Sequence, residues 1–153
     1  MEDLTFQQFI TEVNRTYKEE DDFYRRLARR SGLSDAAFWV LYSIETAPGP
    51  VTQTDIGNTL MLSKQTINSA LKQLEHSGHI CLTDGPGRKK YLQLTQRGRA
   101  LSDRAIRPTL EVERGAFLGL AEEERASLLA LERKYLSLLL REAEAILNTP
   151  QEE

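Results

Sequence analysis

The sequence predicts a mainly α-helical chain that carries one small β-hairpin. Two observations predict this class. Apolar residues recur at steps of three and four over most of the 153 residues, which is the period of an amphipathic helix. The period is broken at two short strand-like runs, 80–83 and 91–94, which flank the turn residues Asp84-Gly85-Pro86-Gly87. We therefore expect helices on both sides of a two-stranded hairpin.

Two helices are expected in the first third of the chain. The first covers residues 5–30, and its middle turn, 18–22, is so charged that we expect it to face water. Ser34 is a favourable N-cap for a second helix over residues 35–47. The segment 48–50 contains two prolines, which stop that helix because proline lacks the backbone donor that a helix needs.

Two short helices follow in close succession. Thr52 and Asp55 have the spacing of a capping box at the start of the first. Ser63 caps the second, and Gly78 stands where a C-terminal glycine is favoured. The second helix has one apolar face, and its opposite face carries polar side chains: Gln65, Asn68, Ser69 and Lys72. A tight connection between two such helices is typical of a helix-turn-helix.

The hairpin and the C-terminal helices complete the expected order. The hairpin has a basic flank, 88–90, and Thr95 can cap the next helix, although Gly98 weakens its first turn. Pro108 is expected to kink or interrupt that helical run. A final apolar-striped helix covers 122–147. The long helices at both ends exceed what a small core can cover, so we expect a second copy of the chain to cover them.

Charge is distributed unevenly along the chain. The net charge of −3 argues against a nucleic-acid partner when it is taken as a whole. Residues 1–50 and 105–153 carry net charges of −3 and −4, whereas residues 51–104 carry +4. A local potential steers a partner more than the total charge does. We therefore expect the middle segment to meet an anion.

The sequence argues against a membrane protein, an enzyme and a metal-binding protein. The single cysteine and the acidic start, Met1-Glu2-Asp3, favour the cytoplasm, and no apolar run approaches the about 20 residues of a membrane span. We find no Gly-rich phosphate loop and no nucleophile elbow, so we do not expect an enzyme. His76, His79 and Cys81 are possible metal ligands, and Cys81 a possible redox sensor. Their spacing straddles a helix end and a strand start, so we expect no metal and no cofactor.

The middle of the chain resembles the multiple-antibiotic-resistance regulator (MarR) family of bacterial transcription factors. The residues that carry the resemblance are 51–56, 62–67, Leu74-Glu75, Gly78, Arg88, Leu94-Thr95 and Gly98. The resemblance implies a winged helix-turn-helix with N- and C-terminal dimerisation helices. Two departures stand out, since the family often has an arginine at the position of Ser69 and an aspartate at that of Pro86.

The same resemblance implies a function and a division of the chain. It implies a DNA-binding repressor that binds an inverted-repeat operator as a homodimer and is released by a small aromatic or phenolic ligand. Residues 34–104 would form the DNA-binding domain, and 1–33 and 105–153 the dimerisation helices. Ser69 keeps an alternative open, namely a winged-helix protein-interaction adaptor without sequence-specific DNA binding.

The chemistry of the side chains assigns roles within this interface. Gln65 and Asn68 can each form a bidentate pair with adenine, whereas the basic side chains suit phosphate, guanine or the minor groove. The predicted DNA-contacting residues are Ser63, Lys64, Gln65, Thr66, Asn68, Ser69, Lys72, Arg88, Lys89 and Lys90. The alternatives are an ordinary exposed helix face and a solvated turn. For Trp39 and Tyr42 we expect core packing, with the lining of a ligand pocket as the alternative.

Overall fold

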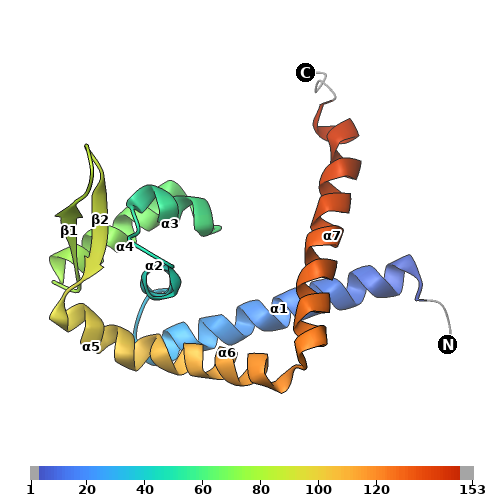
Figure 1. Ribbon diagram of the computed structural model, residues 1–153, viewed down its shortest axis with the longest axis horizontal. Helices are drawn as coiled ribbons and strands as arrows, with labels where there is room; N and C mark the ends of the chain where they lie inside the picture. Colours follow the sequence, from blue (N-terminus) through green and yellow to red (C-terminus); the bar gives the residue numbers. More distant parts are fainter. Residues whose placement is uncertain (1–3, 149–153) are drawn as a thin grey trace. The chain divides into compact units, whose positions relative to one another are not determined.

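The computed structural model describes residues 4–148, which form helices and one two-stranded hairpin. These residues cluster into two compact units, which divide between Leu110 and Glu111 and are described separately. Figure 1 labels the elements: α1 (Phe6–Ser31), α2 (Asp35–Thr46), α3 (Gln53–Thr59), α4 (Lys64–His76), β1 (Ile80–Asp84), β2 (Lys90–Leu94), α5 (Gln96–Ala105), α6 (Arg107–Gly119) and α7 (Glu122–Leu147). The predicted fold class is confirmed.

Local capping signals explain where the helices of the first unit begin and end. The side chains of Thr5 and Ser34 accept hydrogen bonds from backbone N–H groups at the starts of α1 and α2, at 3.3 and 3.2 Å. Thr95 does the same for α5, at 3.0 Å from the Gly98 nitrogen. Gly32 ends α1 at a φ of 74°, in the left-handed region that favours glycine. Residues 18–22 are exposed, as expected.

The core of the first unit is built around α2. Figure 1 shows α2 nearly end-on between α1 and the pair α3 and α4. Phe38, Val40 and Leu41 of α2 are fully buried. They pack in one cluster with Ile67 and Leu74 from the apolar face of α4. Burying an apolar side chain of this size contributes roughly 1.5–3 kcal/mol, so this cluster fixes how α4 is held.

The hairpin is attached to the helix-turn-helix by its second strand. Strands β1 and β2 are antiparallel, and the register pairs Ile80 with Leu94. The buried Leu92 donates its backbone N–H to the carbonyl oxygen of Val51 at 2.8 Å, which makes a β-bridge just before α3 begins. The start of α3 and the hairpin are therefore positioned together.

The helical run after the hairpin is two helices, α5 and α6, with a break at Ile106. Pro108 lies in the first turn of α6, where its missing N–H removes no helical hydrogen bond. The expected interruption is thus confirmed. Gly98 has a role that helix propensity did not indicate: a Cβ at this position would lie 1.8 Å from the His79 carbonyl oxygen. Glycine is what allows α5 to approach the start of β1.

The second unit consists of the end of α6 and α7. Arg125 joins these helices, because its Nε donates to the Phe117 carbonyl oxygen at 2.7 Å and its guanidinium lies 3.9 Å from the centre of the Phe117 ring. Many apolar side chains of α7 remain exposed: Leu128, Leu129, Leu131, Leu136, Leu138, Leu139, Leu140, Ile146 and Leu147. Within residues 4–148, no helix has the length and apolar character of a membrane span.

Candidate nucleic-acid interface

The start of α3 is fixed by a reciprocal capping box. Thr52 accepts a hydrogen bond from the Asp55 backbone N–H at 3.2 Å. The Asp55 carboxylate accepts from the Thr52 backbone N–H and hydroxyl at 2.8 and 2.7 Å. These bonds, with the nearby positive charge of Lys89 as a smaller cause, lower the pKa of Asp55 below its usual value. The first helix of the helix-turn-helix therefore has a well-defined beginning.

Helix α4 separates its apolar and polar side chains onto opposite faces. Ile67, Ala70, Leu71 and Leu74 are buried. The predicted contact residues are not part of the core: Asn68 is half-buried and the rest are exposed, namely Ser63, Lys64, Gln65, Thr66, Ser69 and Lys72. We call these seven residues the reading face. Gln65, Asn68, Ser69 and Lys72 thus lie opposite the buried side chains, and Ser63, Lys64 and Thr66 belong to the exposed N-terminal turn of the same helix.

Two hydroxyls of the reading face serve the helix itself. Ser63 is the N-cap of α4, and its Oγ accepts from the Thr66 backbone N–H at 3.1 Å. The hydroxyls of Ser63 and Thr66 are also hydrogen-bonded to each other, at 2.7 Å. Both side chains are exposed. Both hydroxyls therefore stabilise the first turn of α4 and remain accessible to solvent.

The amide of Asn68 has a partner that the sequence analysis did not identify. Gln53, the first residue of α3, donates a hydrogen bond from its Nε2 to Oδ1 of Asn68. The two residues are fifteen positions apart, so no helical or strand period links them. The contact depends on how the turn between α3 and α4 folds, and it joins the reading face to the start of α3.

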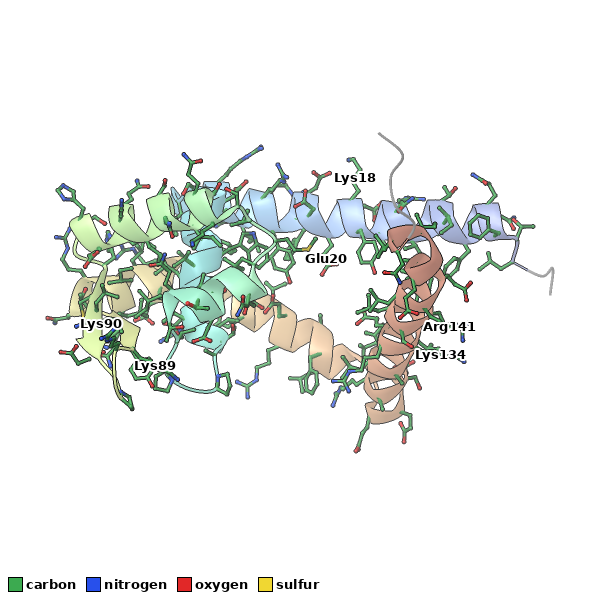
Figure 2. The ribbon with its side chains drawn as sticks, turned by 90° about the horizontal axis from the view of Figure 1, so that it is seen from above. Lys18, Glu20, Lys89, Lys90, Lys134 and Arg141 are labelled. Carbon is green, nitrogen blue, oxygen red and sulfur yellow. The ribbon has the colours of Figure 1, made fainter. Side chains whose placement is uncertain are left out.

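The basic flank of the hairpin is exposed in Arg88, Lys89 and Lys90. Figure 2 shows Lys89 and Lys90 on the hairpin. Lys90 lies opposite Asp84 in the strand register, and its Nζ forms an ion pair with that carboxylate. Arg88 and Lys89 therefore carry most of the uncompensated positive charge of the hairpin. The β-bridge between Leu92 and Val51 places the hairpin beside the start of α3.

Comparison with known proteins agrees with this arrangement. The sequence model of the MarR family matches residues 31–89. The HTH-type transcriptional regulator PecS of Dickeya dadantii is 34% identical over 87 residues, which cover 56% of this chain and 52% of PecS. The chain thus matches about half the length of that curated relative. NMB1585, a MarR family regulator from Neisseria meningitidis, has 26% identity and a TM-score of 0.70, covering 95% of this chain and 98% of that one. Residues 31–89 therefore match the MarR family in sequence, and the chain as a whole is similar in fold to a MarR family regulator.

A further solved structure of the same fold is the MepR–DNA complex of Staphylococcus aureus. It is 22% identical, has a TM-score of 0.63, and covers 91% of this chain and 99% of that one. PecS is a transcriptional regulator and NMB1585 is a MarR family regulator. The frequent arginine of MarR proteins is replaced by Ser69, which is exposed on α4. The structure gives Asp84 a partner, Lys90, near the position where the family often has an aspartate.

The candidate ligand-binding residues Trp39 and Tyr42 lie in a cluster of aromatic rings. The Trp39 ring centre is 4.9 Å from that of Tyr24 and 5.3 Å from that of Tyr42. Trp39 also meets the buried Phe38 edge-on, at 5.7 Å. Both Trp39 and Tyr42 are half-buried and pack against the core. They therefore contribute to packing and present part of their surface to solvent.

Of the two histidines and the cysteine near β1, His79 has a side-chain contact. The hydroxyl of Ser77 is 2.7 Å from Nδ1 of His79. Burial lowers the pKa of His79 below its usual value, and the positive charges of Arg97 and Arg104 act in the same direction. His76 and Cys81 are exposed. In the part of the chain that the structure describes, no three His, Cys, Asp or Glu side chains are grouped as metal ligands.

Proposed function

We propose that this chain is a cytoplasmic transcriptional repressor that binds an inverted-repeat operator in double-stranded DNA as a homodimer. The observation that carries the proposal is the exposed polar side of α4, which is joined to the start of α3 by Gln53. The start of α3 is in turn joined to the basic hairpin by the bridge between Val51 and Leu92. A helix of this kind fits the major groove, and a basic hairpin fits the minor groove and its phosphates. MepR, which has a similar fold, forms a complex with DNA, and this supports a DNA-binding role for the present chain.

The side chains divide by the contacts they can make. Gln65 can pair with adenine through both amide atoms, while Lys64 and Lys72 suit phosphate or guanine. Arg88 and Lys89 supply charge to the minor groove, where a narrow groove concentrates negative potential. Two copies of the reading face would meet half-sites that lie roughly one helical turn apart.

The exposed apolar residues of α7 support the homodimer. Leu131 is 63% exposed and Leu140 is 58% exposed. Soluble proteins seldom leave this much contiguous apolar surface uncovered, and a second copy of the chain would cover it. We assign residues 1–33 and 105–153 to dimerisation and 34–104 to DNA binding. Residues 1–3 and 149–153 of these segments lie outside the described part of the chain.

Binding to duplex DNA over a salt series tests the proposal. The full chain is titrated into a duplex carrying the region upstream of its own gene and into a scrambled duplex of the same composition. A regulator prefers the upstream duplex and loses affinity steeply as salt rises, because its cationic side chains release counterions from DNA. Equal and negligible binding to both duplexes would contradict the proposal and favour the adaptor without sequence-specific DNA binding.

Arg88→Ala is expected to weaken binding to all duplexes alike. If Arg88 neutralises one phosphate, its loss reduces the slope of log affinity against log salt by about 0.9. Lys90→Ala is the matched comparison. Because Lys90 already forms an ion pair with Asp84, this variant is expected to change the slope less than Arg88→Ala does. Fluorescence anisotropy at several salt concentrations measures both slopes. Equal slopes for Arg88→Ala and the wild type would show that Arg88 does not contact DNA phosphate.

A small aromatic or phenolic ligand is expected to bind at the ring cluster of Trp39 and Tyr42. Trp39 is the single tryptophan, so its emission reports on this site alone. Salicylate, a small phenolic acid, is expected to change that emission and to lower operator affinity about tenfold, within the usual range of allosteric coupling. Tyr42→Ala should weaken both effects together. Release of DNA without any change in Trp39 emission would place the ligand elsewhere.

A further inference from the structure

The amide of Gln53 on α3 lies against the amide of Asn68 on α4. Gln53 Nε2 donates a hydrogen bond to Asn68 Oδ1, and this bond bridges the two helices of the helix-turn-helix. Asn68 is half-buried, whereas Gln65 and Ser69 beside it are exposed. The contact therefore orients one side chain in the middle of the reading face while its neighbours remain unconstrained by it.

An asparagine amide has two different sides. Its oxygen accepts hydrogen bonds, and its NH₂ group donates two. A bidentate contact with adenine uses both sides, because the oxygen accepts from adenine N6 while the NH₂ donates to N7. In this structure the oxygen of Asn68 accepts one hydrogen bond from Gln53, which uses one of its two lone pairs and turns the NH₂ group away from Gln53. In the adenine contact expected for Asn68 from the sequence, adenine N6 would have to share this oxygen with Gln53.

We propose that Gln53 is a specificity-determining positioning residue that turns the donors of Asn68 toward the major groove. The inference rests on the proposed function. With its donors presented, Asn68 reads a base edge that offers acceptors. Guanine is the first choice because it offers both N7 and O6, and thymine with its single O4 is the second. Gln53 acts through Asn68 and makes no base contact of its own.

The position of Gln53 suits this role because its backbone is held on two sides. It is the first residue of α3 and follows Thr52, whose capping box with Asp55 fixes the start of the helix. Val51, two residues before Gln53, accepts a hydrogen bond from the Leu92 backbone N–H at 2.8 Å, and this bond connects the segment to the hairpin. A side chain with such an anchored backbone gives up less conformational freedom when it holds Asn68.

Selection from a random library tests the inference without a known operator. A duplex library randomised over about two helical turns is selected with the wild-type chain and with Gln53→Met, which keeps the length of the side chain and removes its amide. We expect the wild type to enrich guanine at the position read by Asn68, identified as the position that Asn68→Ala relaxes. Gln53→Met should relax the same position about fivefold or more and leave the other positions unchanged.

Gln53→Glu gives the sharpest result. A carboxylate at this position only accepts, so the NH₂ of Asn68 turns toward it and the oxygen of Asn68 faces the groove. The preference at that one base should then move from guanine to a base that donates, cytosine through N4 or adenine through N6. A lower affinity for all duplexes is also expected because the new charge repels phosphate. A merely structural role of Gln53 would not exchange one base for another.

Controls separate the inference from the proposed function. Gln73→Met removes the same amide from an exposed position further along α4, and it should leave every base preference intact. If both Gln53 variants kept the base preference of the wild type at the position read by Asn68, the role of Gln53 would be contradicted, whereas the proposed DNA binding would stand. An equal loss of affinity for all sequences by a folded Gln53→Met would also contradict this role, since Gln53 would then be a general docking residue. A wild-type chain that enriches no sequence would overturn the proposed function itself.

Discussion

Replacing Gly98 by alanine is expected to lower the free energy of unfolding by about 3 kcal/mol. A Cβ at this position would lie 1.8 Å from the carbonyl oxygen of His79, and that oxygen belongs to the backbone. The same carbonyl accepts hydrogen bonds from the backbone N–H and the hydroxyl of Thr95, at 3.0 and 3.2 Å. To make room, α5 must move away from the start of β1 and strain or break these bonds.

Urea denaturation followed by circular dichroism measures this effect. Gly57→Ala is the matched control, because nothing lies within 4 Å of a Cβ built on this glycine in α3. That variant is expected to be more stable than the wild type by about 0.5–1 kcal/mol, since alanine is the better helix former. A Gly98→Ala variant as stable as the wild type would show that α5 does not approach the start of β1 as closely as described.

Gly98 also shows which parts of the fold the sequence could predict. Helix starts were predictable because a cap is a local signal: Ser34, Thr52 and Ser63 each hydrogen-bond a backbone N–H three residues later. At Gly98 the local signal was misleading. By helix propensity this glycine destabilises α5. In the fold it is required, because a larger residue would clash with the backbone of His79, nineteen positions earlier.

The candidate site divides in the same way. The reading face of α4 followed from the helical period, because burial of Ile67 and Leu74 turns Gln65 and Ser69 outward. The orientation of Asn68 did not, since it depends on a side chain of another helix. The pairing of Lys90 with Asp84 depends on the register of the hairpin, which the alternation of residues alone did not assign.

Leu131→Glu is expected to convert the proposed homodimer into a monomer and to lower operator affinity more than 100-fold. Leu131 is 63% exposed on α7, in a stripe with Leu128 and Leu138. In a two-fold dimer each substitution occurs twice, and each one replaces apolar burial by an unpaired carboxylate. Loss of the second reading face removes the gain from linked binding, which commonly amounts to 10²–10⁴-fold.

The control is Ser137→Glu, which introduces the same charge on another side of the same helix. Figure 2 shows Lys134 and Arg141 extending together from one side of α7, and Ser137 falls between them at helical spacing. This variant is expected to remain dimeric in sedimentation velocity and to bind the operator like the wild type. If Leu131→Glu remained dimeric, the stripe of Leu128, Leu131 and Leu138 would not be part of the dimer interface.

A duplex with a single half-site distinguishes lost linkage from lost structure. Each chain carries a complete reading face on α4 within the first unit, and Leu131 belongs to the second. A folded Leu131→Glu monomer is therefore expected to bind one half-site with the same affinity as a single reading face of the wild type. The full inverted repeat should show the more than 100-fold difference, because only there does the second face bind at a high effective concentration. Weakened binding to both duplexes would instead mean that the substitution has damaged the reading face itself.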